Sequence, residues 1–293
     1  MRQSKGKIKA IFGGVAAVLA LVLFLLLPHV LPPAGGTDLS DAPFQIHVID
    51  VGQGDAMLLV CREQTVLIDS GTNASEGVLR AYLDSHGVER IDYLIISHPH
   101  EDHMGGADMV LREYEVGALV MSDLAPDADV GMSFTTALIE SDATVMVPRT
   151  GEVLQAGALR LTFLAPPDGG YDDANDNSLV VRCDFGQVSL LTVGDAEAPV
   201  EAWLLEHTTD AALLDVDLLK AGHHGSDTST GEDFLAATTP DYVAISCGRG
   251  NTYNHPVQSV LDAIAAVGAE SCRTDTDGTL VFVSDGVDLW RVR

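Results

Sequence analysis

The chain has 293 residues, of which 46% are hydrophobic, so it can bury one large core of about 250 residues beside a short appendage. The net charge of −27 repels polyanions at long range and disfavours a protein that holds nucleic acid through a basic surface. The four cysteines lack C-x-x-C spacing, which indicates neither a zinc knuckle nor a disulfide-dense scaffold. Lone buried thiols are expected, with one or two disulfides as the alternative.

The N-terminal part reads as a membrane anchor. Residues 1–9 are basic, and residues 10–27 form an apolar run without charge. A helix of that length spans about 27 Å, enough for a thin hydrocarbon core. The charge bias predicts a cytoplasmic segment at 1–9, a signal anchor at 10–27, a linker at 28–43 and an extracytoplasmic domain at 44–293. A cleaved signal peptide, which would give a secreted protein, is the alternative.

From residue 44 the pattern changes to strands. Alternating and short apolar runs predict strands over 44–48, 57–60 and 65–68, joined as an antiparallel meander by glycine-rich turns. A helix follows over 75–86, capped by Ser75 and ended by Gly87. The next expected elements are a strand over 91–97, a helix over 104–113, a strand over 118–121, a helix over 131–141 and a strand over 144–147.

The second half repeats this mixture of elements. Strands over 159–163, 178–182 and 188–193 predict a second antiparallel set. Further on, the pattern predicts a helix over 196–207, strands over 216–220 and 242–246, a helix over 256–267, and strands over 279–283 and 288–292. Periodicity alone therefore indicates an α/β or α+β protein with one core.

Three histidines and two acids occupy six consecutive residues directly after the strand at 91–97. His98 and His100 stand two residues apart, so an extended backbone points both rings to one side, while Asp102 and His103 follow the turn. Imidazole and carboxylate suit zinc, manganese or iron, and a site without thiolates favours catalysis over structure. A surface loop with a chance histidine cluster is the alternative.

These residues resemble the H-x-H-x-D-H signature of the metallo-β-lactamase superfamily, and four more stretches resemble its ComEC-like branch. They are Asp50 to Asp55 (DVGQGD), Leu67 to Gly71 (LIDSG), Leu191 to Asp195 (LTVGD) and Lys220 to Ser226 (KAGHHGS). Together with Asn254-His255-Pro256 they follow the family's order across residues 44 to 293. The resemblance implies a four-layered αββα sandwich with two metals at its edge.

The resemblance also implies roles for individual residues. His98 and His100 would bind one metal, Asp102 and His103 the other, and Asp195 would bridge the two, although Asp195 could instead cap the helix at 196. One of His223 and His224 would complete the second metal's ligands. On a strand exit these two side chains would point to opposite sides. The implied metal ligands are His98, His100, Asp102, His103, Asp195, His223 and His224.

Other residues are expected to support the ligands. Asp55 and Asp69, in glycine-bounded turns, would accept ring N–H groups or hold the loop, with plain turn-forming aspartates as the alternative. No histidine lies between His103 and Asp195, where most members of the superfamily place a ligand. Asn177, or its neighbour Asp176, could take a weaker role there.

The expected activity is hydrolysis with two divalent cations, zinc or alternatively manganese, that activate water. Candidate catalytic residues are Asp102, His224 and His255, of which His255 would contact substrate or donate a proton, or would be merely structural. A small-molecule or cell-wall phosphodiester is the expected substrate. The alternatives are a ComEC-like nuclease in DNA uptake, which the acidic charge and the single predicted span disfavour, and a catalytically weak binding module of the same fold.

Overall fold

The computed structural model describes residues 42–126 and 128–292. The predicted cytoplasmic segment, anchor and most of the linker lie outside them. In the part described, no helix combines the length and the apolar character that crossing a bilayer needs.

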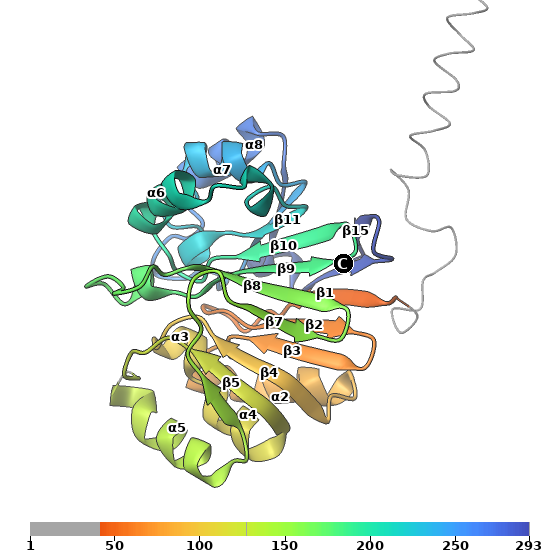
Figure 1. The fold of residues 1–293 in the computed structure, drawn as a ribbon, viewed down its shortest axis with the longest axis vertical. Helices are drawn as coiled ribbons and strands as arrows, with labels where there is room; N and C mark the ends of the chain where they lie inside the picture. The colour runs from red at the N-terminus through yellow and green to blue at the C-terminus, as the bar shows by residue number, and fades with distance from the viewer. Residues whose placement is uncertain (1–41, 127, 293) are drawn as a thin grey trace, which may run out of the picture. The chain divides into compact units, whose positions relative to one another are not determined.

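An eight-stranded mixed sheet carries the first half of the domain (Figure 1). Its first three strands in chain order pair as the predicted antiparallel meander, the next three are added by parallel pairing, and the last two strands of the chain pair antiparallel beside the first. Apolar, β-branched runs suit these positions because both faces of the sheet are covered. In spatial order the strands are β15 (Leu289–Arg291), β14 (Leu280–Ser284), β1 (Phe44–Val48), β2 (Met57–Cys61), β3 (Gln64–Ile68), β4 (Arg90–Ile96), β5 (Glu115–Met121) and β6 (Thr144–Met146).

A seven-stranded sheet packs against the first. Its antiparallel part contains the second predicted set, and its parallel part begins where β10 pairs with β11. In spatial order the strands are β13 (Glu270–Arg273), β12 (Tyr242–Ile245), β11 (Leu218–Lys220), β10 (Val188–Thr192), β9 (Val180–Phe185), β8 (Leu159–Ala165) and β7 (Val153–Ala156).

Helices cover the outer face of each sheet (Figure 1). The first group is α2 (Glu76–Ser85), α3 (Glu101–Met104), α4 (Ala107–Glu113) and α5 (Ala128–Glu140). The second is α6 (Ala198–His207), α7 (Glu232–Thr238) and α8 (Gln258–Ala266), and a short α9 (Thr274–Asp277) precedes β14. Three apolar clusters, one between the sheets and one under each helical layer, give the predicted αββα order.

Several short elements, among them α3 and α9, were not predicted from the sequence. The strand β7 is a short edge strand whose residues alternate between exposed and buried, and β13 is a polar edge strand. The helix α7 is only seven residues long. Short elements at an edge carry little apolar periodicity, so the pattern misses them. The four cysteines are free and buried, as predicted.

The topology brings the predicted site residues to the strand ends. The parallel strands β3 and β4 lead to Asp69 and His98, while the parallel strands β10 and β11 lead to Asp195 and His223. Carboxyl ends of parallel strands share one edge of a sheet, which is where α/β folds place their ligands.

Candidate metal centre

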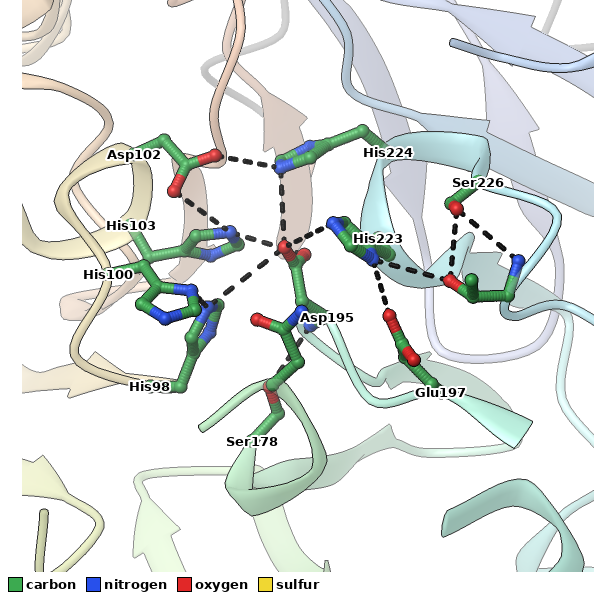
Figure 2. A network of polar contacts seen from close by, with 12 residues as sticks. His98, His100, Asp102, His103, Ser178, Asp195, Glu197, His223, His224 and Ser226 are labelled. Atoms are coloured by element: carbon green, nitrogen blue, oxygen red, sulfur yellow. Dashed lines mark hydrogen bonds and ion pairs between the residues drawn. The ribbon is translucent and has the colours of Figure 1, made fainter. Parts of the chain in front are cut away.

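The loop after β4 brings its histidines together. His98 and His103 are buried, with ring centroids 4.2 Å apart, and His98 Nε2 lies 3.0 Å from His100 Nδ1. His100 keeps an extended backbone just before α3, so Asp102 and His103 turn with the first residues of the helix. One loop therefore presents three imidazoles and a carboxylate, as the motif predicted (Figure 2).

Asp195 lies at the middle of the cluster, and imidazoles from two loops, the one after β4 and the one after β11, surround it (Figure 2). Its Oδ1 is 3.2 Å from His103 Nε2, and its Oδ2 is 3.6 Å from His224 Nε2, 3.7 Å from His223 Nε2 and 4.0 Å from His98 Nε2. The residue that precedes α6 is Glu197, so Asp195 does not cap that helix and the alternative reading is wrong. The buried carboxylate therefore faces imidazoles from both halves of the domain.

His223 and His224 do not diverge as expected. Both residues have left-handed backbones, with φ of 44° and 55°, in a turn over Gly222–Gly225 in place of the assumed strand exit. Both rings consequently approach Asp195. His223 Nδ1 lies 3.0 Å from Glu197 Oε1, whereas His224 is buried and its Nε2 lies 3.2 Å from Asp102 Oδ2.

Four residues fit a metal ion best. One ligand atom from each of Asp102, His103, Asp195 and His224 lies within 4.8 Å of the others. Two of their atoms, His103 Nε2 and Asp195 Oδ1, are buried and lie 3.2 Å apart, and neither forms a hydrogen bond of good geometry. Buried polar atoms normally have partners, so these orphaned atoms point to a missing ligand, and two imidazoles with two carboxylates match zinc or manganese.

The titration of the cluster reflects its density of negative charge. Burial opposes ionisation of Asp195, but His103 and His224 outweigh it and hold the pKa of that carboxyl well below its usual range. Burial would lower the pKa of His224, but Asp195 and Asp55 raise it to about 10. The carboxylates of Asp195 and Asp55 therefore stabilise positive charge in this cluster, as the acidic groups of a cation site must.

Asp69 and Asp55 lie behind the ligands. Asp69 accepts hydrogen bonds from the Ser97 backbone (2.7 Å) and hydroxyl (2.8 Å), and its Oδ2 is 2.9 Å from His103 Nδ1. A carboxylate on the far ring nitrogen fixes the tautomer of a ligand histidine. Asp55 Oδ1 lies 3.3 Å from His224 Nδ1. Both positions match the supporting role predicted over that of plain turn residues.

Asn177 does not reach this cluster in the way suggested. Its amide accepts from the Tyr171 backbone and donates to the carbonyls of Tyr171 and Asp173, so it closes its own loop. The neighbouring Asp176 accepts from the Glu197 backbone. Two further residues that support the site were not predicted: the Ser178 hydroxyl accepts a hydrogen bond from the Asp195 backbone, and Glu197 contacts His223.

His255 lies beside the centre. Its ring centroid is 5.7 Å from that of His223 and 5.7 Å from that of Tyr253, and its Nδ1 is buried without a partner. Asn251 holds the His255 backbone at both N–H and carbonyl. Burial, with His223 and His224, lowers the pKa of His255, which favours the neutral ring and fits substrate contact better than proton donation at neutral pH.

Gly54 is needed for the approach of two loops. A Cβ at Gly54, where φ is 142°, would lie 2.4 Å from the carbonyl oxygen of Asp102. We expect Gly54→Ala to lower the free energy of unfolding by about 3 kcal/mol and to weaken metal binding, because the Asp102 loop must move. Gly52→Ala is the matched control, since Gly52 also has positive φ but meets nothing within 4 Å. It should cost about 1 kcal/mol. Equal losses in chemical denaturation would contradict the role of this contact.

Comparison with known proteins gives a consistent result. A family model described as the metallo-beta-lactamase superfamily matches residues 49–249. The chain is 31% identical to ComE operon protein 3 of Bacillus subtilis (strain 168), covering 81% of this chain and 33% of that protein. It is 32% identical to Recombination protein 2 of Haemophilus influenzae, covering 77% and 27%. The chain thus spans about a third of the length of the curated relatives it matches.

Solved structures show the same fold. The metallo-beta-lactamase fold protein YhfI from Bacillus subtilis has a TM-score of 0.56 at 13% identity, covering 81% of this chain and 99% of that one. CmlA, a diiron beta-hydroxylase from Streptomyces venezuelae, has a TM-score of 0.55 at 15% identity, covering 83% and 54%.

Proposed function

The chain belongs to the metallo-beta-lactamase superfamily and is related to competence proteins, and on that premise we propose that it is a metal-dependent phosphodiester hydrolase. The observation that carries the proposal is the convergence on Asp195 of imidazoles from both halves of the domain. Such a convergence has little structural purpose, because buried ionisable groups cost stability unless something compensates them.

The proposed ligands form two groups, one for each cation. Asp102, His103, Asp195 and His224 would hold one cation, and His98 and His100, with Asp195 between the positions, would hold the other. When bound, two divalent cations supply a nucleophile from water near neutral pH and offset the charge that develops on the attacked phosphorus. Asp69 keeps His103 oriented, and His255 borders the substrate side. Zinc is the expected metal and manganese the alternative.

The substrate side is open. Asp102 keeps 31% of its side chain exposed, and the exposed ring of Tyr253 stacks on His255. A small or cell-wall phosphodiester suits a domain that the sequence predicts to be anchored outside the membrane. Similarity to a recombination protein and to a competence protein favours a nuclease that acts on DNA as a second candidate. Only twelve basic residues follow residue 9, against 43 acidic ones, and that balance weakens a nucleic-acid interface.

A substrate panel tests the proposal. We expect the metal-loaded full chain to hydrolyse a generic phosphodiester faster than a phosphomonoester or a β-lactam, and His100→Ala to lose at least a hundredfold in kcat/KM. Single-stranded DNA is included in the same panel, and a preference for DNA over the generic phosphodiester would indicate the nuclease. Metal binding without turnover of any ester would support a binding module, while a preference for the β-lactam would refute the phosphodiester assignment.

A further inference from the structure

Lys220 is a buried cation directly behind the metal centre. It lies at the end of β11, is 1% exposed, and is the only lysine after residue 9. Its Nζ lies 2.8 Å from Asp55 Oδ2 and donates to the Ala221 carbonyl at 2.7 Å. A buried ammonium needs such partners, because an uncompensated charge in the interior is very unfavourable.

Asp55 in turn contacts two of the proposed ligand-bearing segments. Its backbone N–H donates to the Asp102 carbonyl at 3.0 Å, and its Oδ1 lies 3.3 Å from His224 Nδ1. His224 Nδ1 also lies 2.9 Å from the Ser246 carbonyl oxygen, and the Ser246 hydroxyl donates to the Gly54 carbonyl at 2.7 Å. The residue that Lys220 fixes therefore lies between Asp102 and His224.

Asp55, Asp69 and His103 could themselves be taken for a metal site, since their ligand atoms lie within 4.8 Å of one another. The ammonium of Lys220 already neutralises Asp55, and Asp69 already has Ser97 and His103 as partners. The cavity beside them measures about 10 Å³, which is room for about one water molecule. Lys220 thus supplies the positive charge that this second cluster requires.

We propose that Lys220 is a positioning residue of the metal centre: its ammonium fixes Asp55, and Asp55 places His224 and the Asp102 loop for metal binding. The inference rests on the metal centre of the proposed function and adds a residue that touches none of the proposed ligand side chains. Removing a residue that contacts a metal ligand typically changes metal affinity by about 10- to 100-fold. We expect an effect of that size at Lys220, which acts on the ligands through Asp55.

The test measures zinc affinity of the full chain by competition with a chelator, together with the absorption spectrum of the Co²⁺-substituted protein. We expect Asp55→Asn and Lys220→Met each to weaken binding about 10- to 100-fold and to alter the Co²⁺ spectrum. Because Lys220 acts through Asp55, the double variant should be no more than about threefold weaker than Asp55→Asn. Melting of the metal-free proteins measures the structural cost separately.

Asp108→Asn is the matched control, because Asp108 is a buried carboxylate paired with Arg112 on α4. It should lower the melting temperature and leave zinc affinity unchanged. If Lys220→Met leaves Asp55 unpaired and fails to fold, the charge-neutral double variant, Asp55→Asn with Lys220→Met, is used alone. Its zinc affinity is then compared with those of Asp55→Asn and the wild type. Variants that melt earlier but bind zinc as the wild type does, or single effects that multiply in the double variant, would overturn the inference. A wild type that binds no zinc would instead refute the metal centre itself.

Discussion

Asp195→Asn is expected to reduce phosphodiester turnover by at least about a thousandfold. The substitution removes a carboxylate that four imidazoles approach, and replaces a charged oxygen with a neutral amide. The loss should appear in kcat and in metal content together, because the residue would hold both cations. Steady-state kinetics at saturating zinc, with metal analysis of the same sample, measure both quantities.

Asp176→Asn is a suitable control for that experiment. Asp176 is a buried acid that accepts from the Glu197 backbone, and it makes no contact with the ligand side chains in the part of the chain described. It should retain activity within about tenfold, as expected for a loss of local support. If Asp195→Asn kept the wild-type rate, the assignment of a bridging carboxylate would be wrong.

The two adjacent histidines are expected to differ sharply. His224→Ala should cost about a thousandfold in kcat/KM and reduce zinc content, because His224 is buried and joins Asp102, His103 and Asp195. His223→Ala should lower kcat/KM only about tenfold to a hundredfold, because His223 is partly exposed and its ring contacts the Glu197 carboxylate. Parallel kinetics and metal analysis of the two variants compare them directly.

The reverse order, with His223→Ala losing more metal than His224→Ala, would contradict this assignment. It would place the ligand on the exposed side of the turn and leave His224 as the oriented partner of Asp55 and Ser246. Equal, small losses in both variants would mean that neither ring holds a cation.

The sequence was informative where residue type and spacing both matter. The cluster from His98 to His103 was predicted to bring its imidazoles together, and they do lie together. The meander over 44–68 and the set over 159–193 are confirmed. Asp195 could be singled out because it ends an apolar run. These features depend on local pattern, which a single sequence displays directly.

Other features depend on tertiary structure and could not be read in advance. The convergence of His223 and His224 requires two non-glycine residues with left-handed backbones, an arrangement that no propensity predicts. The pairing of Lys220 with Asp55 joins positions 165 residues apart. Lysine and aspartate are seldom fully buried, so the burial of this pair could not be predicted from residue type. Asn177 was a reasonable substitute for the missing histidine until its contacts with Tyr171 and Asp173 showed its amide to be engaged.

Metal content of the full chain is the most direct test of the central claim. After purification in zinc and exhaustive dialysis, we expect about two divalent ions per wild-type chain, the number a dinuclear site requires. We expect fewer than one in Asp195→Asn. Wild-type protein that retains no ion under these conditions, while still folded, would contradict the claim that these imidazoles and carboxylates form a metal centre.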